Sequence, residues 1–529
     1  MRRKKLAERF RCAFGAVPDV RYEAADPARI RAYYEFRREN EEETFFLDDI
    51  TWNDLDMEDI FLRINPGLSF SGEQYLYYLL RAPAQTRQEY ERRRRVIGLM
   101  EKDAALRLEV QLLLSRLGCR RKVELCQAFS PKSHSLLWLA IYVLLFLMLL
   151  ASAISVTFST QTGLMLLVLA CTMNSIVHEV RVRQVQSDFD TVNYIVNMAF
   201  VLRRLRRLHH AGLDRELEQA YEALDDLKAI LRTGGVSRAP DDGISAMVTM
   251  VTLVDLIAYE FLKRRLAKGH RQLFAIHEGL GKLDAAIAAA SWRCGMVCRC
   301  DPELDFEQEH IRIEAEGLVH PLLDEPVAND LKAERPVLIT GSNASGKSTF
   351  LKSAALCAVL SQGLCTAPAQ RYTAGAFRVY SSMALSDDLL AGESYYIVET
   401  RSLKRILDEA QQTGQPVLCV VDEVLRGTNT VERIAASSQV LAELAGKQVM
   451  CLTATHDLEL CELLAAQYDL YHFREYIDGE RMWFDYLLRP GKAVSRNAIN
   501  LLRLLGFDEQ LVKRAHERAN GYWETGIWR

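Results

Sequence analysis

The spacing of apolar residues predicts a long helical region followed by a region in which strands and helices alternate. Apolar positions recur at helical spacing through residues 1–130 and again through 181–292, for example in Glu73–Arg81 and Met247–Leu266. From about residue 306 onward, short apolar runs such as PVLIT and VLCVV alternate with helical patterns. That alternation is typical of an α/β domain built on a parallel sheet.

One apolar run among the helices is long enough to cross a membrane. No Asp, Glu, Lys or Arg occurs from Ser133 to His178, and Leu136–Val156 holds 21 apolar or small residues, about 30 Å of helix. After the polar break TFSTQT, the run Gly163–Val177 reaches membrane length if it takes in part of that break. We therefore expect a transmembrane hairpin over residues 136–177, in which Asn174 needs a partner on the other helix.

Charges around this hairpin predict its orientation. The turn between the two runs carries no charge, whereas both flanks carry basic residues, namely Arg120, Arg121, Lys122, Lys132, Arg181 and Arg183. Basic flanks stay on the cytoplasmic side. We therefore expect the chain in the cytoplasmic (inner) membrane, with both termini and the region after residue 306 in the cytoplasm. The alternative is a buried helical hairpin in a soluble core.

Overall composition adds little to this picture, whereas the local distribution of charge is informative. The 529 residues carry a net charge of only -4, so the chain has no overall bias toward nucleic acid. Arg92–Arg95, Arg203–His210 and Lys263–Arg271 are basic stretches, each either a solvated helix face or a surface for phosphates or anionic lipid. The twelve cysteines are scattered, and the cluster CGMVCRC has no second pair at metal-site spacing. The basic start lacks the apolar segment of a signal peptide, so a reduced, cytoplasm-facing protein is expected.

A glycine-rich loop lies between a predicted strand and a predicted helix. Gly341–Ser348 reads GSNASGKS and fits the pattern G-x-x-x-x-G-K-[ST], in which glycines let the backbone wrap phosphates. The N-terminus of the following helix adds partial positive charge. Lys347 is expected to reach the β- and γ-phosphates of ATP, and the Ser348 hydroxyl is expected to bind Mg²⁺.

Two further predicted strands end in residues suited to nucleotide hydrolysis. The first ends in Asp422, a candidate Mg²⁺ ligand, and Glu423, a candidate for polarising the attacking water. The second ends in His456, which is placed to sense the γ-phosphate. A surface acidic pair and a satisfied core histidine would explain each motif alone. Together the three motifs predict an ATPase site with Glu423, Lys347 and His456 as catalytic residues.

These motifs resemble the ATPase domain of the MutS family of DNA mismatch-repair proteins. The loop GSNASGKST keeps the Asn343 of the family's GPNxGGKST, Asp422–Thr430 (DEVLRGTNT) matches DExxRGT, and Ala454–His456 matches ATH. Ser386–Glu399 resembles the family's signature segment, in which Ser394 takes the position of a serine that reaches the partner subunit's γ-phosphate. The resemblance is strong over about residues 306–510 and weaker over the helical first half.

The resemblance implies a homodimer with composite ATP sites and Mg²⁺ as a cofactor. It implies nucleotide binding by Gly341, Ser342, Asn343, Ala344, Ser345, Gly346, Lys347, Ser348, Thr349 and Ser394, and metal binding by Ser348 and Asp422. The helices that resemble the family's core begin too early to leave room for its mismatch-recognition domain. The hairpin falls where relatives insert a DNA-gripping clamp. The resemblance thus indicates a truncated, membrane-anchored relative, in which Val327 replaces an aromatic ring that many relatives place on the adenine.

The expected architecture is a mixed fold in four parts. Residues 1–130 form the first half of a helical core and lever region, 131–180 a transmembrane helical hairpin, 181–305 the second half of the lever region, and 306–529 an α/β P-loop NTPase domain of ABC/MutS type.

Two functions fit this architecture. The first is a membrane-anchored ATPase that binds mismatched, branched or damaged DNA through basic helices such as Arg203–Arg207, with ATP-dependent rearrangement of the dimer. The alternative is a nucleotide-driven membrane switch or scaffold that acts on a protein or lipid partner without DNA. A transporter-type ATPase is disfavoured, because the chain has two spans and no LSGGQ-type signature.

Overall fold

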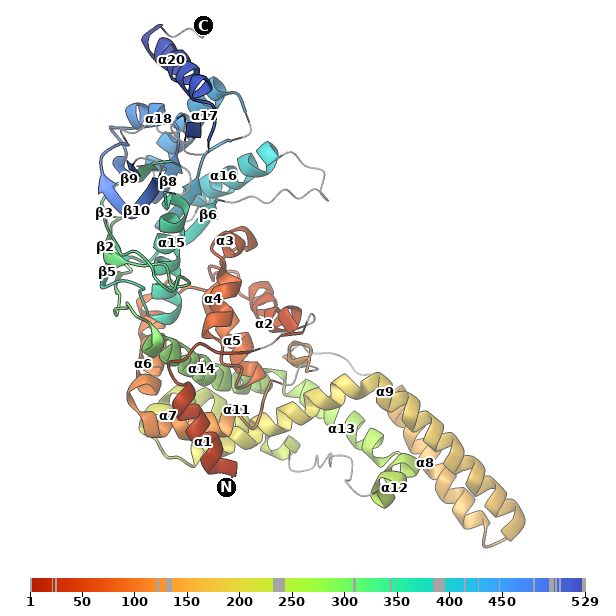
Figure 1. The fold of residues 1–529 in the computed structure, drawn as a ribbon. Coiled ribbons are helices and arrows are strands. Elements are labelled where there is room, and N and C mark those ends of the chain that lie inside the picture. The colour runs from red at the N-terminus through yellow and green to blue at the C-terminus, as the bar shows by residue number, and fades with distance from the viewer. Residues whose placement is uncertain are drawn as a thin grey trace. The chain divides into compact units, whose positions relative to one another are not determined.

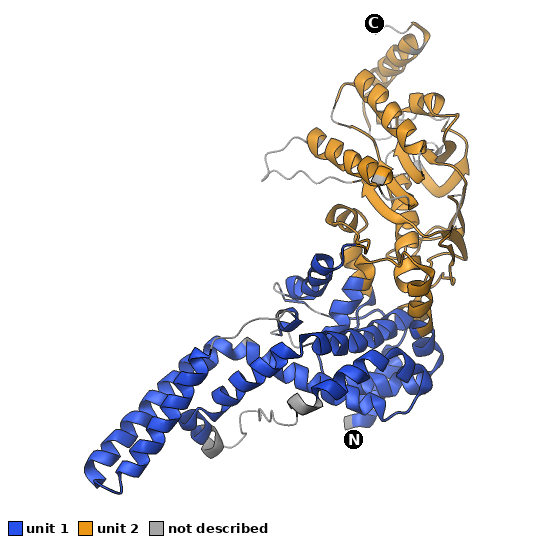
Figure 2. Ribbon diagram, turned by 180° about the vertical axis from the view of Figure 1, so that it is seen from behind, with its two compact units in different colours: residues 1–42, 64–78, 96–291 blue, residues 43–63, 79–95, 292–529 orange. Residues whose placement is uncertain are grey.

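The computed structural model divides the chain into two compact units that alternate along the sequence. The first contains residues 1–42, 64–78 and 96–291, and the second contains 43–63, 79–95 and 292–529 (Figure 2). The structure describes all residues except 1, 21, 24–25, 120–122, 130–135, 232–242, 308–310, 343–344, 384–394, 413–414, 427, 447, 479–480, 494–498, 500–501, 504–505 and 526–529. The units thus differ from the four consecutive parts expected from the sequence, because residues 43–63 and 79–95 pack with the C-terminal part.

Helices build the first unit, as the apolar spacing predicts. The helices that lie in this unit are α1 (Arg2–Ala13), α2 (Asp26–Asn40), α7 (Ala104–Leu114), the 3₁₀ helix η1 (Leu125–Phe129), α8 (Leu137–Ser155), α9 (Thr160–Arg206), α10 (Ala211–Glu216), α11 (Glu218–Leu231), α12 (Gly243–Thr252) and α13 (Val254–Lys268). Four helices contribute residues to both units, namely α4 (Met57–Ile64), α5 (Phe70–Arg81), α6 (Arg87–Lys102) and α14 (His270–Gly295).

The predicted hairpin is formed by α8 and α9, which lie side by side in Figure 1. Helix α9 begins at Thr160, so the second apolar run does take in part of the polar break, and it bends at Val185. At the turn, a Cβ atom on Gly163 would lie 2.4 Å from the backbone of Val156, so only glycine allows this approach. At the other end of the hairpin, the Arg181 guanidinium lies 3.8 Å from the centre of the Trp138 ring. Each of these residues is 18 positions from Gly163 or Val156 at the turn. These contacts fix the register of the two helices.

The stretch Met247–Leu266 is helical as expected, but Leu253 has a positive φ of 56° and separates α12 from α13. One expectation for this region is wrong. Asn174 does not bond to the other helix of the hairpin. Its side-chain amide donates to the backbone carbonyl of Val251 at the end of α12, over 2.8 Å. Helix α12 packs against α9, and α13 packs against both α8 and α9.

The second unit contains two β-sheets. Its remaining elements are α3 (Asp49–Asp54), β1 (Glu303–Asp305), β2 (Ile313–Leu318), β3 (Asn329–Ala333), β4 (Val337–Thr340), α15 (Lys347–Leu364), β5 (Arg371–Gly375), β6 (Arg378–Ser382), α16 (Tyr395–Gln412), β7 (Val417–Asp422), α17 (Thr430–Ala445), β8 (Val449–Thr455), α18 (Leu458–Leu463), β9 (Asp469–Asp478), β10 (Arg481–Pro490) and α20 (Glu509–Thr525). One sheet has the order β1-β5-β2-β3 and the other β10-β9-β4-β8-β7-β6.

The larger sheet positions the predicted site. Strands β9, β4, β8, β7 and β6 are parallel, and β10 is antiparallel at the edge. Every residue of β4, β7 and β8 is buried, which explains the uninterrupted apolar runs in the sequence. In register, Thr340 faces Thr455 and Asp422 faces Ala454. The carboxyl ends of these three strands therefore meet at one edge of the sheet.

Helix α3 explains why an early segment belongs to the second unit. Asp48 caps its N-terminus by accepting from the backbone N–H of Thr51. The Asp54 carboxylate accepts from the Ser381 hydroxyl at 2.6 Å and from the backbone N–H of Met383 at 3.0 Å. These bonds satisfy buried groups at the end of β6, which no further strand covers in this sheet order.

Helix α15 is held at its C-terminal end by buried arginines. Arg293 donates to the carbonyl of Cys365 at 2.6 Å, and Arg93 donates to the carbonyls of Gln362 and Gly363 at 3.4 and 3.3 Å. Cationic side chains stabilise a helix C-terminus through its unpaired carbonyls and its dipole. Within the basic stretch 92–95, Arg93 is thus a buried structural residue, whereas its neighbours are exposed.

Candidate nucleotide site

The glycine-rich loop joins β4 to α15 and opens onto the edge of the sheet. Gly341 and Gly346 have φ values of 154° and 102°. A Cβ atom on Gly341 would lie 2.9 Å from the Ser345 hydroxyl, and one on Gly346 would lie 3.2 Å from the Tyr486 ring. Glycine at the N-cap leaves the first-turn N–H groups of α15 free of side-chain caps, as phosphate binding requires.

Lys347 lies in this loop with its ammonium group turned inward. Its Nζ donates to the carbonyls of Gly341 and Ser342 at 2.9 and 2.8 Å. Burial lowers the pKa of Lys347 to about 8, although the carboxylates of Asp422 and Glu423 act in the opposite direction. The Lys347 ammonium is therefore protonated at neutral pH, but it loses its proton at a lower pH than an ordinary lysine.

Ser348 and Asp422 come together as the sequence predicts for a metal site. The Ser348 hydroxyl, in the first turn of α15, donates to Oδ2 of Asp422 at the end of β7 over 2.5 Å. A hydroxyl and a carboxylate are oxygen ligands of the kind that Mg²⁺ binds beside phosphates. In the described part of the loop, the hydroxyls of Ser342 and Ser345 are buried without a hydrogen-bond partner. Such donors fit phosphate oxygens, so the residues present suit Mg-ATP.

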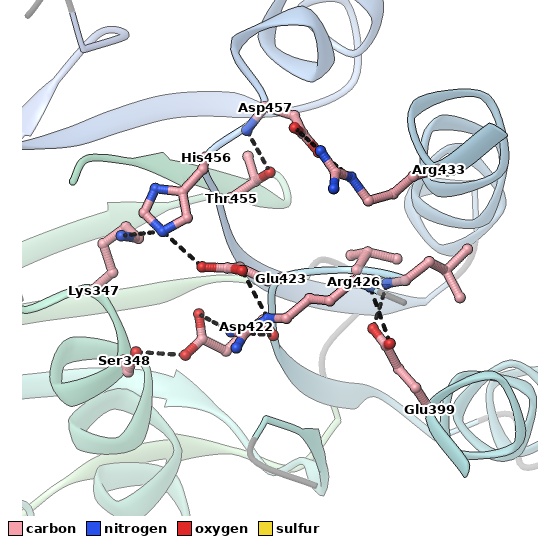
Figure 3. A network of polar contacts seen from close by, with 12 residues as sticks. Lys347, Ser348, Glu399, Asp422, Glu423, Arg426, Arg433, Thr455, His456 and Asp457 are labelled. Carbon is pink, nitrogen blue, oxygen red and sulfur yellow. Dashed lines mark hydrogen bonds and ion pairs between the residues drawn. The ribbon is translucent and has the colours of Figure 1, made fainter. Parts of the chain in front are cut away.

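Glu423 lies between His456 and Arg426 at the centre of the site (Figure 3). Its Oε1 is 2.7 Å from Nε2 of His456, and its Oε2 is 2.7 Å from Nε of Arg426. Burial disfavours the charged form of Glu423, but the bond from His456 and the charges of Arg426 and Lys347 outweigh burial and lower the pKa below its ordinary value. Glu423 is therefore an ionised carboxylate whose two oxygens are both engaged.

The backbone that carries Glu423 is strained and braced. Glu423 and Leu425 have φ values of 58° and 59°, a region that costs a non-glycine residue about 1–3 kcal/mol. The Glu399 carboxylate on α16 accepts from the backbone N–H groups of Leu425 and Arg426 (Figure 3). Burial raises the pKa of Glu399, and these two N–H groups act against that rise. Glu399 thus ties α16 to the loop that carries Glu423.

The third strand places His456 between the lysine and the glutamate. Nε2 of His456 is 3.5 Å from Nζ of Lys347 as well as 2.7 Å from Glu423. The next residue, Asp457, receives two bonds from the Arg433 guanidinium, at 3.0 and 2.6 Å. Its backbone N–H donates to the Thr455 hydroxyl at 3.0 Å. The turn after β8 is therefore held firmly, and His456 can respond to a group bound beside Lys347.

A cavity of about 580 Å³ opens beside these residues. Ligand pockets commonly have volumes of about 300–1,000 Å³. The residues that line it include Leu318, His320, Pro326, Val327, Asn329, Ser345, Gly346, Lys347, Ser348, Thr349, Asp422, Glu423, Arg426, Phe473 and Tyr486. It therefore has room for a nucleotide next to the glycine-rich loop.

Tyr486 supplies an aromatic ring that the sequence analysis did not anticipate. It belongs to β10, at a point where the pairing with β9 shifts, and its φ is 54°. The Asn329 side chain holds this bulge, donating to the carbonyl of Tyr486 at 3.0 Å and accepting from the N–H of Leu488 at 2.6 Å. The cavity thus has an aromatic wall although Val327 is aliphatic and partly exposed.

Most of the predicted site residues converge on this cavity. The structure brings together Gly341, Ser342, Ser345, Gly346, Lys347, Ser348, Thr349, Asp422, Glu423 and His456. Asn343, Ala344 and Ser394 lie outside the described residues. No role was predicted for Arg426, Glu399 or Tyr486. Arg426 lies within DEVLRGTNT and Glu399 ends the segment Ser386–Glu399, so their positions in these motifs were a usable signal.

The fold and this arrangement are those of a domain of the P-loop NTPase type. Residues 337–522 match the family model described as MutS domain V. Among curated proteins, the chain is similar to three that are named DNA mismatch repair protein MutS. With that of Natronomonas pharaonis it shares 36% identity over 235 residues, which is 42% of this chain and 26% of that protein. With that of Thermus aquaticus it shares 32% identity over 258 residues, which is 47% of this chain and 30% of that protein.

The similarity extends beyond residues 337–522. With the MutS protein of Granulibacter bethesdensis, identity is 30% over 353 residues, or 61% of this chain and 37% of that protein. Only 193 of the 529 positions lie from residue 337 onward, so this similarity reaches into the helical region. The chain is therefore similar to MutS proteins in its C-terminal part and in part of its helical region, as the motifs indicated. It spans about a quarter to somewhat more than a third of the length of these proteins.

Proposed function

We propose that this chain binds Mg-ATP and hydrolyses it. The observation that carries the proposal is the ionised Glu423, held 2.7 Å from His456 at the same sheet edge as Lys347 and the Ser348–Asp422 pair. Lys347 and the first-turn N–H groups of α15 bind the phosphates, and Ser348 and Asp422 hold Mg²⁺. Bound Mg²⁺ neutralises charge on the phosphates. Glu423 orients the attacking water once one of its oxygens leaves His456 or Arg426.

The dimer forms part of this proposal. Ser394 precedes α16, and the resemblance to MutS gives it a role at the γ-phosphate of a second subunit. Ser394 of the partner subunit then completes each site, so ATP binding favours the dimer and hydrolysis loosens it. Because Glu399 on α16 braces the loop of Glu423, the same helix would connect the partner's nucleotide to the catalytic loop.

Membrane anchoring through residues 136–177 is supported by the surface of the hairpin. Helices α8 and α9 each contain an apolar window long enough to span a bilayer, and only 28% and 17% of those windows are buried. A hairpin in the core of a soluble protein would be mostly buried. The hydroxyls of Ser152, Thr172 and Ser175 donate to backbone carbonyls one turn earlier, so they need no water. We place the protein in the cytoplasmic membrane with both termini and the ATPase domain in the cytoplasm.

The end of α9 is the proposed contact for DNA. Arg203, Arg204, Arg206 and Arg207 are exposed there. Arg206 pairs with Asp225 at 2.9 Å, and the Arg204 guanidinium lies 5.3 Å from the centre of the Phe200 ring. Arg203 and Arg207 are therefore the better phosphate ligands. Arg203 is 22 positions from Arg181, or about 33 Å of helix, several times the Debye length of about 8–10 Å. The argument that places Arg181 at lipid headgroups therefore does not extend to Arg203, and the relatives' name favours DNA there.

DNA should stimulate ATP hydrolysis by the nanodisc-bound protein at about 50 mM salt and much less at about 200 mM salt. Phosphate contacts carry no base readout, so duplex, branched and single-stranded DNA should all bind. Replacing Arg203 and Arg207 with Ala should lower the slope of log K against log salt by about 1.8, since each phosphate contact contributes about 0.9. Fluorescence anisotropy with labelled DNA at four salt concentrations measures this slope.

Arg183→Ala is the matched control, because Arg183 is an exposed arginine on the same helix beside the apolar window. It should leave the slope unchanged. Absence of DNA binding at the lower salt concentration would remove the DNA proposal. The alternative, a nucleotide-driven membrane switch that acts on a protein or lipid partner, would then account for the ATPase, and Arg181 and Arg183 beside the hairpin are the residues that favour it.

ATP affinity should fall as the pH rises above about 8. Burial lowers the pKa of Lys347 to about 8 in the free site, and bound phosphates would raise it again. ATP binding therefore takes up a proton above that pH, and affinity should fall by up to about tenfold per pH unit. Titration with a fluorescent ATP analogue from about pH 7 to pH 9.5 measures this. Lys347→Met should bind weakly with a flat profile, and a flat profile for the parent would contradict the assignment.

A further inference from the structure

Helix α12 is an apolar helix that leaves part of its surface exposed beside the hairpin. From Gly243 to Val254 the sequence contains no Asp, Glu, Lys or Arg. The helix packs against α9, yet the side chains of Met247 and Val248 are 64% and 56% exposed, and Val254 after the break is 52% exposed. Unlike the basic end of α9, this surface has no basic side chain that could bind an anionic partner.

Contacts along α9 place the end of α12 at the depth of the apolar window. Arg181 stacks on Trp138 and donates to the Tyr142 hydroxyl at 2.8 Å, which marks the end of the hairpin near the charged flanks. Asn174 lies seven positions nearer the turn, or about 10 Å along the helix. Its bond to the carbonyl of Val251 therefore holds the last turn of α12 beside the proposed membrane span.

Three polar groups at this end of α12 bond to protein atoms, namely the carbonyl of Val251, the hydroxyl of Thr252 and the carboxylate of Asp255. The break at Leu253 frees carbonyls in the last turn of α12, and the fully buried Asn174 amide takes that of Val251. The Thr252 hydroxyl donates to the carbonyl of Val248 at 2.7 Å. Asp255, the first charged residue after the break, pairs with His178 at 2.8 Å. A helix end in water can bond to water instead, whereas a helix end in lipid depends on protein partners of this kind.

We propose that α12 inserts into the cytoplasmic leaflet as a third membrane segment, with Met247, Val248 and Val254 against lipid acyl chains. This inference rests on the membrane anchoring proposed above. Ten residues of helix measure about 15 Å, half of the roughly 30 Å hydrocarbon core, so α12 reaches one leaflet and returns through α13. Helix α9, against which α12 packs, also exposes apolar residues such as Leu169 and Ile176, and lipid is the proposed occupant of both surfaces.

Site-specific quenching tests the proposal on the full chain. Cys12 and Cys294, the exposed cysteines among the described residues, are first replaced with Ser. Val248→Cys is then labelled with bimane in phosphatidylcholine nanodiscs, and the signal of the unsubstituted background is subtracted. The label at position 248 should be quenched several-fold more by doxyl-labelled lipid than by iodide. Leu147→Cys, on the exposed face of α8, is the lipid reference, and Lys268→Cys, at the exposed end of α13, is the water reference.

The outcomes distinguish the insertion of α12 from the membrane anchoring of the hairpin on which it rests. If the label at position 147 is lipid-quenched and the label at position 248 behaves like that at 268, α12 faces water or a protein and the inference is wrong. If the label at position 147 is itself quenched by iodide, the membrane anchor fails. Asn174→Leu should move only the label at position 248 toward iodide quenching. An unchanged label there would refute the role of Asn174 in holding α12 at that depth.

Discussion

Replacing Glu423 with Gln should slow ATP hydrolysis by about 10²–10⁴-fold while ATP binding stays within a few-fold of the parent. Gln keeps the size of the side chain and an acceptor for Arg426, but it lacks the negative charge that draws a proton from water. The pKa of Glu423 lies below its ordinary value because of His456, Arg426 and Lys347, so the parent carries that charge throughout the neutral range. Single-turnover hydrolysis and binding of a fluorescent ATP analogue measure the two effects separately.

Lys347→Ala gives the contrasting result. Lys347 donates to loop carbonyls and faces the cavity, so its removal should weaken ATP binding as well as hydrolysis. Hydrolysis by Glu423→Gln at the parent rate would show that another group activates the water. Hydrolysis by Lys347→Ala at the parent rate would show that the glycine-rich loop is not the phosphate site.

Replacing Glu399 with Ala should lower kcat by about 10²-fold and leave ATP binding nearly unchanged. The carboxylate satisfies the N–H groups of Leu425 and Arg426, and a buried N–H without a partner costs about 1–3 kcal/mol. Without that bond the left-handed residues Glu423 and Leu425 should relax toward ordinary backbone angles. A shift of about 1 Å in a reacting group costs about 10²-fold in rate. Steady-state kinetics on the full chain give kcat and KM.

Two comparisons distinguish this bracing role from general destabilisation. Glu399→Gln keeps one carbonyl acceptor and should recover part of the lost kcat. Asp408→Ala changes a partly exposed carboxylate on the same helix that pairs with Lys404, and it should leave kcat unchanged. If Glu399→Ala lowers the melting temperature but not kcat, the residue only stabilises the fold.

Local patterns predicted the parts of the structure that depend on local order. Buried parallel strands produce uninterrupted apolar runs, and β4, β7 and β8 are read directly from VLIT, VLCVVD and VMCLTAT. Parallel pairing then brings their carboxyl ends together, which is why Lys347, Asp422, Glu423 and His456 meet as expected. The helical hairpin followed equally from length and apolar content.

Features that depend on distant pairing were missed. Arg93 stands in a run of four arginines that reads as a surface, but its side chain caps carbonyls 269 and 270 positions away. Asn174 needed a partner, and the structure supplies it from α12 through a backbone carbonyl that carries no sequence signal. Tyr486 reaches the cavity because of a shift in strand pairing, which apolar alternation does not reveal. Each case depends on which segments meet in space.

The clamped helix α15 has a mechanical consequence. It is 18 residues long, or about 27 Å, and almost all of its residues are buried, so it behaves as a stiff rod. One end carries Lys347 at the phosphates, and the other is fixed by Arg93 and Arg293. A rod transmits displacement along its axis without loss. A small axial shift of the loop on nucleotide binding would therefore move the C-terminal end of α15 against Arg93 on α6. These arginine contacts are where movement at the ATP site would first reach other helices.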